Sequence, residues 1–165
     1  MNLDGEYTPQ MVISGGWQCG GSDGGSIERA VAAARSQPAF GRTSIQTSLA
    51  AAGSRKLQVK VNAQLLSAAG TGRLAVMLAI YENGLVSKIG AGENGGREIT
   101  YDYTVRKLLP VFELDGAKGA SASKELNIEL DDSWSLAHLG VAAFIQDSTS
   151  LKIEGASSRY PIARN

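Results

Sequence analysis

The sequence predicts a mainly β protein, in which an antiparallel β-sandwich follows a short N-terminal unit made of a β-hairpin and one helix. From about Thr43 onward, apolar and polar residues alternate with period two in several segments, as they do in half-buried strands. Glycine, asparagine or aspartate separates these segments, and none of the intervening stretches has helical spacing. The 165 residues are 43% hydrophobic and 19% charged, which is enough apolar material for a buried core.

The N-terminal stretch YTPQMVISGG, residues 7–16, predicts the first strand of a hairpin. Its side chains alternate after a Thr-Pro step, and a Gly-Gly pair then breaks the strand. A short return strand is expected around Trp17, before a second Gly-Gly pair.

A helix is expected after the hairpin, because apolar residues recur there at helical spacing: Ile27, Ala30, Val31 and Ala34. Ser26 is the expected N-cap, since its hydroxyl can accept a hydrogen bond from a backbone N–H of the first turn. Pro38 is expected to stop the helical pattern.

Seven or eight strands are predicted for the rest of the chain. Lys56 to Leu65 alternates without a fault, and Leu74 to Tyr81 is a nearly continuous apolar run, which is typical of a central strand. Glu82-Asn83-Gly84 predicts a hairpin turn into a shorter strand. The shorter strand and the remaining ones are expected at residues 85–89, 99–106, 126–130, 139–146 and 151–156.

The change of period from helix to strand suggests two domains. Residues 38–42 are the expected linker, so we predict a hairpin-and-helix domain over residues 1–40 and a β-sandwich domain over residues 43–165.

The charge balance gives no support for a nucleic acid or an anionic membrane as partner. Sixteen basic and sixteen acidic residues give zero formal net charge. No apolar run approaches the roughly 18 residues that a membrane span needs, so neither a nucleic-acid partner nor a membrane span is expected. The visible N-terminus has no basic segment followed by an apolar one, so it carries no recognisable signal peptide. If Met1 is the true start, the expected location is the cytoplasm.

Two glycine-rich loops deserve comparison with phosphate-binding motifs. Gly90 to Gly95 matches G-x-G-x-x-G, but a strand pattern follows it instead of a helix, and Glu93 would oppose a phosphate. Residues 15–25 do lead into a helix, yet they lack the lysine of a phosphate loop, and Asp23 would oppose an anion. Both loops are therefore expected to be ordinary turns, and no cofactor is expected.

Catalytic and metal sites are not indicated either. The chain has one histidine, His138, and one cysteine, Cys19, which cannot by themselves build a zinc site or a Cys-His nucleophile pair. The Asp131-Asp132 pair could bind calcium, but a solvated turn is the favoured interpretation. Cys19 is a candidate reactive thiol, although an incidental thiol is favoured because no second cysteine accompanies it.

Several segments resemble a known family when they are taken together and in order. They are YTPQMVISGG, GSDGGSIERAVAAA, LAIYENGLVSKIGAGENGGREITYDYTVRKL and LGVAAFIQDSTSLKIEGA. These segments resemble the bacterial family called domain of unknown function 1223, a secreted family with a thioredoxin-like first domain and a β-sandwich second domain. The resemblance implies that residues 1–40 are the C-terminal remnant of a thioredoxin-like domain, and that the protein is periplasmic or secreted.

The resemblance also assigns individual residues. Thr8-Pro9 would be the cis-proline element that stands beside the redox cysteines in thioredoxin-like folds. Glu93, Asn94, Arg97 and Arg106 would match the motif of the second domain, whose role is unknown.

The sequence departs from the family in one respect that matters for function. The N-terminal part of the family's first domain, with its Cys-x-x-Cys pair, is not found in this chain, and a thiol–disulfide exchanger needs both an attacking and a resolving thiol. We therefore expect a non-catalytic β-sandwich protein that acts as a binding or structural module. The alternative is a fragment of a secreted thiol–disulfide oxidoreductase-like protein, which would need the missing Cys-x-x-Cys segment.

A partner is expected at the hairpin. A strand over residues 10–14 with no neighbour on one side would leave an unpaired edge, so either another chain (a protein partner or a second copy) is expected to cover it, or the sandwich hides it. A sugar-binding sandwich is a third hypothesis, and Trp17 is its only support in the sequence.

Overall fold

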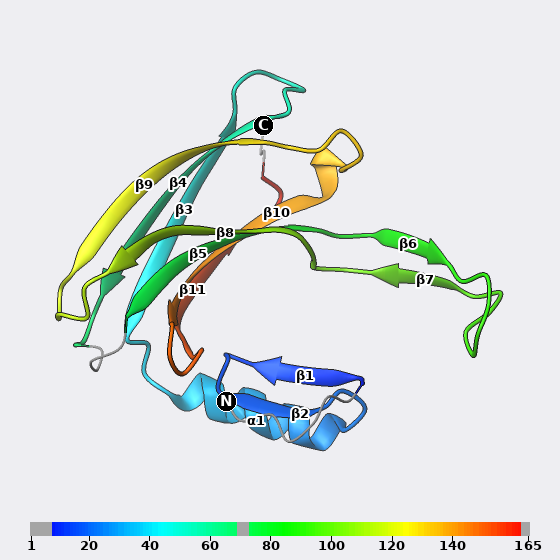
Figure 1. Ribbon diagram of the computed structural model, residues 1–165, viewed down its shortest axis with the longest axis horizontal. Helices are drawn as coiled ribbons and strands as arrows, with labels where there is room; N and C mark the ends of the chain where they lie inside the picture. The colour runs from blue at the N-terminus through cyan, green and yellow to red at the C-terminus, as the bar shows by residue number, and fades with distance from the viewer. Residues whose placement is uncertain (1–7, 69–72, 163–165) are drawn as a thin grey trace.

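The computed structural model describes residues 8–68 and 73–162, which form a small N-terminal unit and a two-layer β-sandwich (Figure 1). The N-terminal unit consists of β1 (Gln10–Ile13), β2 (Trp17–Gly20) and α1 (Gly24–Ser36). The strands of the sandwich are β3 (Gly41–Leu49), β4 (Lys56–Leu65), β5 (Leu74–Glu82), β8 (Thr104–Leu114), β9 (Ser121–Glu129), β10 (Leu139–Asp147) and β11 (Ile153–Arg159). A single 3₁₀ turn, Leu136–His138, precedes β10.

The two sheets of the sandwich are antiparallel throughout. One has four strands in the order β11-β10-β5-β8, and the other has three in the order β3-β4-β9. The predicted mainly β, antiparallel fold is therefore confirmed.

The hydrophobic core lies between the two sheets. The inward residues of β4 alternate as the sequence predicts, and they meet the inward residues of β5 and β10. The side chains that are fully buried include Leu57, Val59, Val61, Leu65, Leu74, Val76, Leu78, Ile80, Leu139, Val141 and Ile145. Burial of such side chains, at roughly 25 cal/mol per Å² of apolar surface, is the main stabilising term of the sandwich.

The outer faces of the two sheets differ in chemistry. The outward positions of the three-stranded sheet are all polar: Arg42, Ser44, Gln46, Ser48, Gln58, Lys60, Asn62, Gln64, Ser121, Ser123, Glu125 and Asn127. The outward positions of the four-stranded sheet are mostly apolar, since Met77, Ala79 and Tyr81 of β5 lie between Pro110, Leu108 and Val105 of β8 and Phe144, Ala142 and Gly140 of β10. Water normally faces the first kind of surface, and another element normally covers the second.

The predicted hairpin turn at Glu82-Asn83-Gly84 is wrong. The strand after it, β6 (Leu85–Lys88), does not return along β5 but pairs with β7 (Glu98–Tyr101), and the two form an arm that leaves the sandwich (Figure 1). Side chains hold the chain open at this point, because the backbone N–H of Gly84 donates to Asp102 (2.8 Å) and the N–H of Tyr103 donates to Asn83 (2.7 Å).

Three further expectations need correction. The single strand predicted over residues 99–106 is interrupted at Asp102 and Tyr103, and Tyr103 has a positive φ of 53°. The helix is capped by Asp23 and not by Ser26, because the Asp23 carboxylate accepts from the Ser26 N–H at 3.0 Å. In addition, Gly41 and Arg42 belong to β3, so the connection to the sandwich is shorter than the predicted 38–42 linker.

Candidate functional site

Neither edge of the N-terminal hairpin has a strand beside it among the residues that the structure describes, and the edge on β1 is the one on the side nearer to the sandwich (Figure 1). Gly21 N–H donates to the Pro9 carbonyl (2.7 Å), and β1 pairs with β2 in the register Met11 to Cys19 and Ile13 to Trp17. Because backbone groups of an antiparallel pair alternate in direction, those of Met11 and Ile13 point to β2, and those of Gln10 and Val12 point away from it. The latter groups form the free edge of β1.

The N-terminal unit has too little core to be stable by itself. Met11 and Val12 are 40% and 49% exposed, and no residue of α1 is buried. A lone two-stranded hairpin is at best marginally stable in water unless a helix or further strands pack well against it, and here the helix buries none of its residues. Its order therefore depends on contacts with something else.

One such contact is with the sandwich. The Ile153 N–H at the start of β11 donates to the Ser14 carbonyl at 2.9 Å. A cavity of about 450 Å³ lies between the two units, and its lining includes Trp17, Phe40, Lys152 and Glu154. Burial raises the pKa of the Glu154 carboxyl, and Lys152 partly opposes this effect. Sequence patterns do not indicate this cavity, because its lining comes from segments that are far apart in the chain.

Thr8-Pro9 and Cys19 lie in the N-terminal unit. The Thr8-Pro9 peptide bond is cis. The Pro9 carbonyl accepts from the Gly21 N–H, and this hydrogen bond holds the start of the hairpin. Cys19 is half-buried and lies with Arg29 and Ala30 in a shallow depression between β2 and α1. A thioredoxin-like role for Thr8-Pro9 and reactivity of the Cys19 thiol both remain predictions.

The four motif residues do not form a single site. Glu93, Asn94 and Arg97 lie in the loop at the tip of the arm, where the Arg97 side chain donates to Asn94 (3.3 Å) and the Arg97 N–H donates to the Asn94 carbonyl (3.1 Å). Arg106 lies at the other end of the arm, in β8. The length of β6 and β7 separates the two places (Figure 1).

Arg106 belongs to a buried polar cluster at the base of the arm. The Glu82 side chain is only 4% exposed, and its Oε2 lies 3.5 Å from Arg106 Nε. Its Oε1 accepts from the Ser135 N–H (2.8 Å), and the Arg106 guanidinium lies 5.5 Å from the centre of the Trp134 ring. The sequence predicted a turn residue at Glu82, and only the fold shows that its carboxylate meets Arg106 and the Ser135 N–H.

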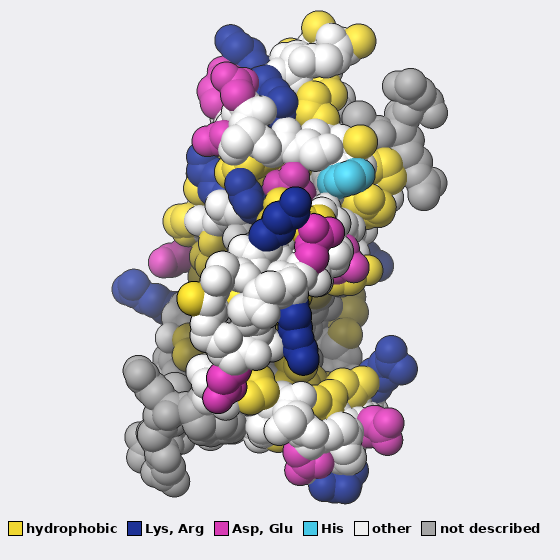
Figure 2. All heavy atoms as spheres, turned by 90° about the vertical axis from the view of Figure 1, so that its right-hand side faces the viewer, with side chains coloured by type: hydrophobic (Ala, Val, Ile, Leu, Met, Phe, Trp, Pro, Cys, Tyr) yellow, Lys and Arg dark blue, Asp and Glu magenta, His cyan; other side chains and the backbone are white. Residues whose placement is uncertain are grey.

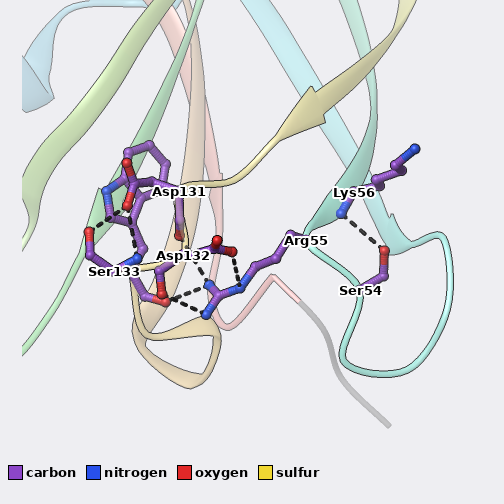
Figure 3. Close-up of polar contacts among 7 residues, drawn as sticks. Ser54, Arg55, Lys56, Asp131, Asp132 and Ser133 are labelled. Atoms are coloured by element: carbon purple, nitrogen blue, oxygen red, sulfur yellow. Dashed lines mark hydrogen bonds and ion pairs between the residues drawn. The ribbon is translucent and has the colours of Figure 1, made fainter.

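The Asp131-Asp132 turn is held by Arg55, which precedes the neighbouring strand β4 of the same sheet (Figure 3). The Arg55 guanidinium donates to the carbonyls of Asp131, Asp132 and Trp134 and pairs with the Asp132 carboxylate at 3.7 Å. Asp131 accepts from Ser133, and this hydrogen bonding lowers the pKa of the Asp131 carboxyl. The pair is thus engaged in holding the turn.

Charge and composition show no concentrated site on the arm end of the molecule. Figure 2 looks at that end and shows basic and acidic side chains of both signs mixed among hydrophobic and neutral ones. Across residues 8–68 and 73–162, no three metal-ligating side chains gather into a group. In the same residues no helix has the length and apolar character needed to cross a membrane.

A family model described as "Protein of unknown function (DUF1223)" matches residues 1–146. Curated proteins offer no match. Among solved structures, HBP35 of Porphyromonas gingivalis is similar with a TM-score of 0.64 at 15% identity, over 82% of this chain and 45% of that one. A domain of the outer membrane lipoprotein Omp28 from Porphyromonas gingivalis matches with a TM-score of 0.45 at 12% identity, over 73% of this chain and 94% of that one. The likeness to HBP35 extends to the fold alone, and this chain spans less than half of it.

Proposed function

The chain belongs to the DUF1223 family of proteins of unknown function, and from this membership we propose that it is a non-catalytic binding module whose free β1 edge accepts a polypeptide strand. In this proposal the hairpin and helix are the closing part of a thioredoxin-like layer, and the sandwich anchors them. A periplasmic or secreted location is part of the proposal and depends on the resemblance to a secreted family.

One observation carries the proposal, namely the open edge of a unit that cannot stabilise itself. Gln10 and Val12 direct backbone donors and acceptors away from β2, and Met11 and Val12 expose apolar side chains beside them. Strand addition would satisfy these backbone groups and cover this surface in one step.

The alternative function, thiol–disulfide exchange, has less support from the residues of this chain than the binding module has. Cys19 is the only cysteine of the chain, and it is half-buried against α1. Thiol–disulfide exchange needs a second thiol to resolve the mixed disulfide, and this chain supplies none. An insulin-reduction assay separates the two functions. We expect background activity, whereas activity that Cys19→Ser abolishes would overturn the non-catalytic proposal.

Selection of random 20-residue peptides displayed on phage tests strand binding directly. The selected peptides should protect the amides of Gln10 and Val12 from hydrogen exchange. Val12→Pro should weaken binding by about tenfold or more, because it removes a donor from the free edge without breaking a β1–β2 bond.

Gln18→Pro is the matched control for that selection. Gln18 is the register partner of Val12, so its N–H points to the opposite edge of the hairpin. Binding should stay within about twofold of wild type in this variant, given the roughly 1.4 kcal/mol that corresponds to a tenfold change. Failure to recover peptides that protect β1, or an equal loss in both proline variants, would overturn the proposal.

A further inference from the structure

The apolar outer face of the four-stranded sheet is the largest feature that the proposed strand binding leaves unexplained. Its middle column is Met77, Ala79 and Tyr81, with Leu108 and Val105 on one side. Leu108, Val105 and Tyr103 are 54%, 57% and 72% exposed. Monomeric soluble proteins seldom expose so continuous an apolar surface unless it binds something.

Three tyrosines at one end of this face form an ordered aromatic group. The Tyr81 ring lies 5.5 Å from the Tyr103 ring and 6.5 Å from the Tyr160 ring, measured between centres. Tyr81 can lie flat across β10 because its neighbour is Gly140, where a Cβ atom would approach the ring to 2.3 Å. Tyr103 is held in place by the bond from its N–H to Asn83. The Tyr81 ring is buried (7% exposed) beneath the exposed Tyr103 and the partly exposed Tyr160 (43%), and fixed tyrosines such as these two are frequent at the centres of protein interfaces.

The C-terminal end of β1 lies against the sheet that carries this face. Ser14 follows β1 in the turn, with a positive φ of 48°, and its carbonyl accepts from the Ile153 N–H at the start of β11. Glu154 and Ala156 of β11 line the cavity against Trp17, so the N-terminal unit already packs beside this sheet. Figure 1 shows β1 on the side of the N-terminal unit that is nearer to the sandwich.

We infer that the free edge of β1 and the apolar face centred on Tyr81 and Leu108 form one docking surface for a single polypeptide, which adds a strand to β1 and packs its apolar side chains on the face. The inference rests on the proposed function and extends it from an edge to a surface. The face is continuous with the existing contact between the two units, which favours a polypeptide layer as the occupant. In HBP35 the matched fold accounts for only 45% of the chain, so there this fold accompanies substantial further polypeptide.

The peptide library described above tests the surface, because 20 extended residues at about 3.3 Å each can reach from β1 across the face. Leu108→Lys should weaken the selected peptides by about tenfold or more. Asn62→Lys, an equal change of charge on the polar outer face, should leave binding within about twofold. The thermal unfolding midpoints of both variants should match wild type, since neither side chain is part of the core.

The outcomes separate the two proposals. If Val12→Pro weakens peptide binding and Leu108→Lys does not, the docking surface is overturned, while the proposal of strand addition at β1 stands. If Leu108→Lys weakens peptide binding and Val12→Pro does not, both the proposal of strand addition at β1 and the docking surface are overturned. Sedimentation velocity of the chain alone is the last measurement. If the chain self-associates and Leu108→Lys abolishes this self-association, the occupant is a second copy and the inference is overturned. Failure to recover any peptide would also overturn it.

Discussion

The Glu82 carboxylate shows how a single residue joins the arm to the sandwich. It ends the inward row of β5, so a charge occupies the position where the next core side chain would lie. Ser135 N–H binds one oxygen, while Oε2 has no hydrogen-bond partner among the described residues and depends on the nearby Arg106 for compensation. A buried carboxylate is tolerated only when its charge is balanced in this way.

Replacing Arg106 by methionine should therefore destabilise the protein by about 1–3 kcal/mol, since it leaves a buried charge unpaired and removes the contact with Trp134. Urea unfolding of the variant measures this loss. Lys88→Met is the control, because it breaks the exposed Lys88–Glu98 pair (4.0 Å) of the arm and should change stability by less than about 0.5 kcal/mol. If Arg106→Met lowers the free energy of unfolding no more than Lys88→Met does, Arg106 does not compensate the buried charge of Glu82.

Asp147 makes the turn beside the N-terminal unit sensitive to pH. Its carboxylate accepts from the N–H groups of Ser150 and Thr149, and these bonds lower the pKa of Asp147. A lowered folded-state pKa gives stability that is present above the unfolded-state pKa, about 3.9, and is lost as the pH falls through the lowered value. Asp147→Asn should be less stable than wild type at pH 7, by less than about 1 kcal/mol because the group is exposed, and the gap should close toward pH 2. Urea midpoints over this range test the sign, and a gap that stays constant would refute it.

At the scale of elements, sequence reasoning found β4, whose two faces differ, but did not extend the strand predicted over residues 99–106 through the proline of β8. The alternation of Lys56–Leu65 reflects one core face and one polar face, so β4 was predictable. β8 runs to Leu114 through Pro110, which is tolerated because β8 is an edge strand and its register with β5 shifts there. The arm was not predictable, since the Asn83 and Asp102 contacts that create it join residues about 20 apart.

The seam between β3 and β11 gives a prediction at this scale. A Cβ atom on Gly155 would lie 2.1 Å from the Gly41 carbonyl oxygen and 2.6 Å from its carbon, so the two sheets can meet there only without a side chain. Gly155→Ala should cost about 1–3 kcal/mol, because backbone must move. Gly20→Ala, in a strand where an added Cβ meets nothing within 4 Å, should stay within about 0.5 kcal/mol of wild type. Equal urea midpoints for the two variants would show that the backbone at Gly41 and Gly155 can move apart at little cost in stability.

At the scale of the whole molecule, the free edge could be predicted and the apolar face could not. The edge follows from the short hairpin predicted over residues 7–20, and among the described residues β1 pairs with β2 alone. The face was hidden because Leu74–Tyr81 is apolar at nearly every position, and such a run does not reveal which side lies in the core and which side is outside. Only the pairing of β5 with β8 and β10 places Tyr81 and Met77 outward.

The division into two units leads to the last prediction. Every buried hydrophobic residue that the structure describes lies between Leu57 and Ile162, so the sandwich core owes nothing to the N-terminal unit. A chain that begins at Ala39, and so keeps the Phe40 carbonyl bonds to Leu66 and Ser67, should unfold cooperatively with a thermal midpoint within about 5 °C of the whole chain. In the whole chain, amides of residues 10–36 should exchange by local opening, far faster than those of β4, β5 and β10. Hydrogen exchange read by mass spectrometry and calorimetry measure both. A truncated chain without a sharp transition would mean that the hairpin, helix and sandwich fold as one unit.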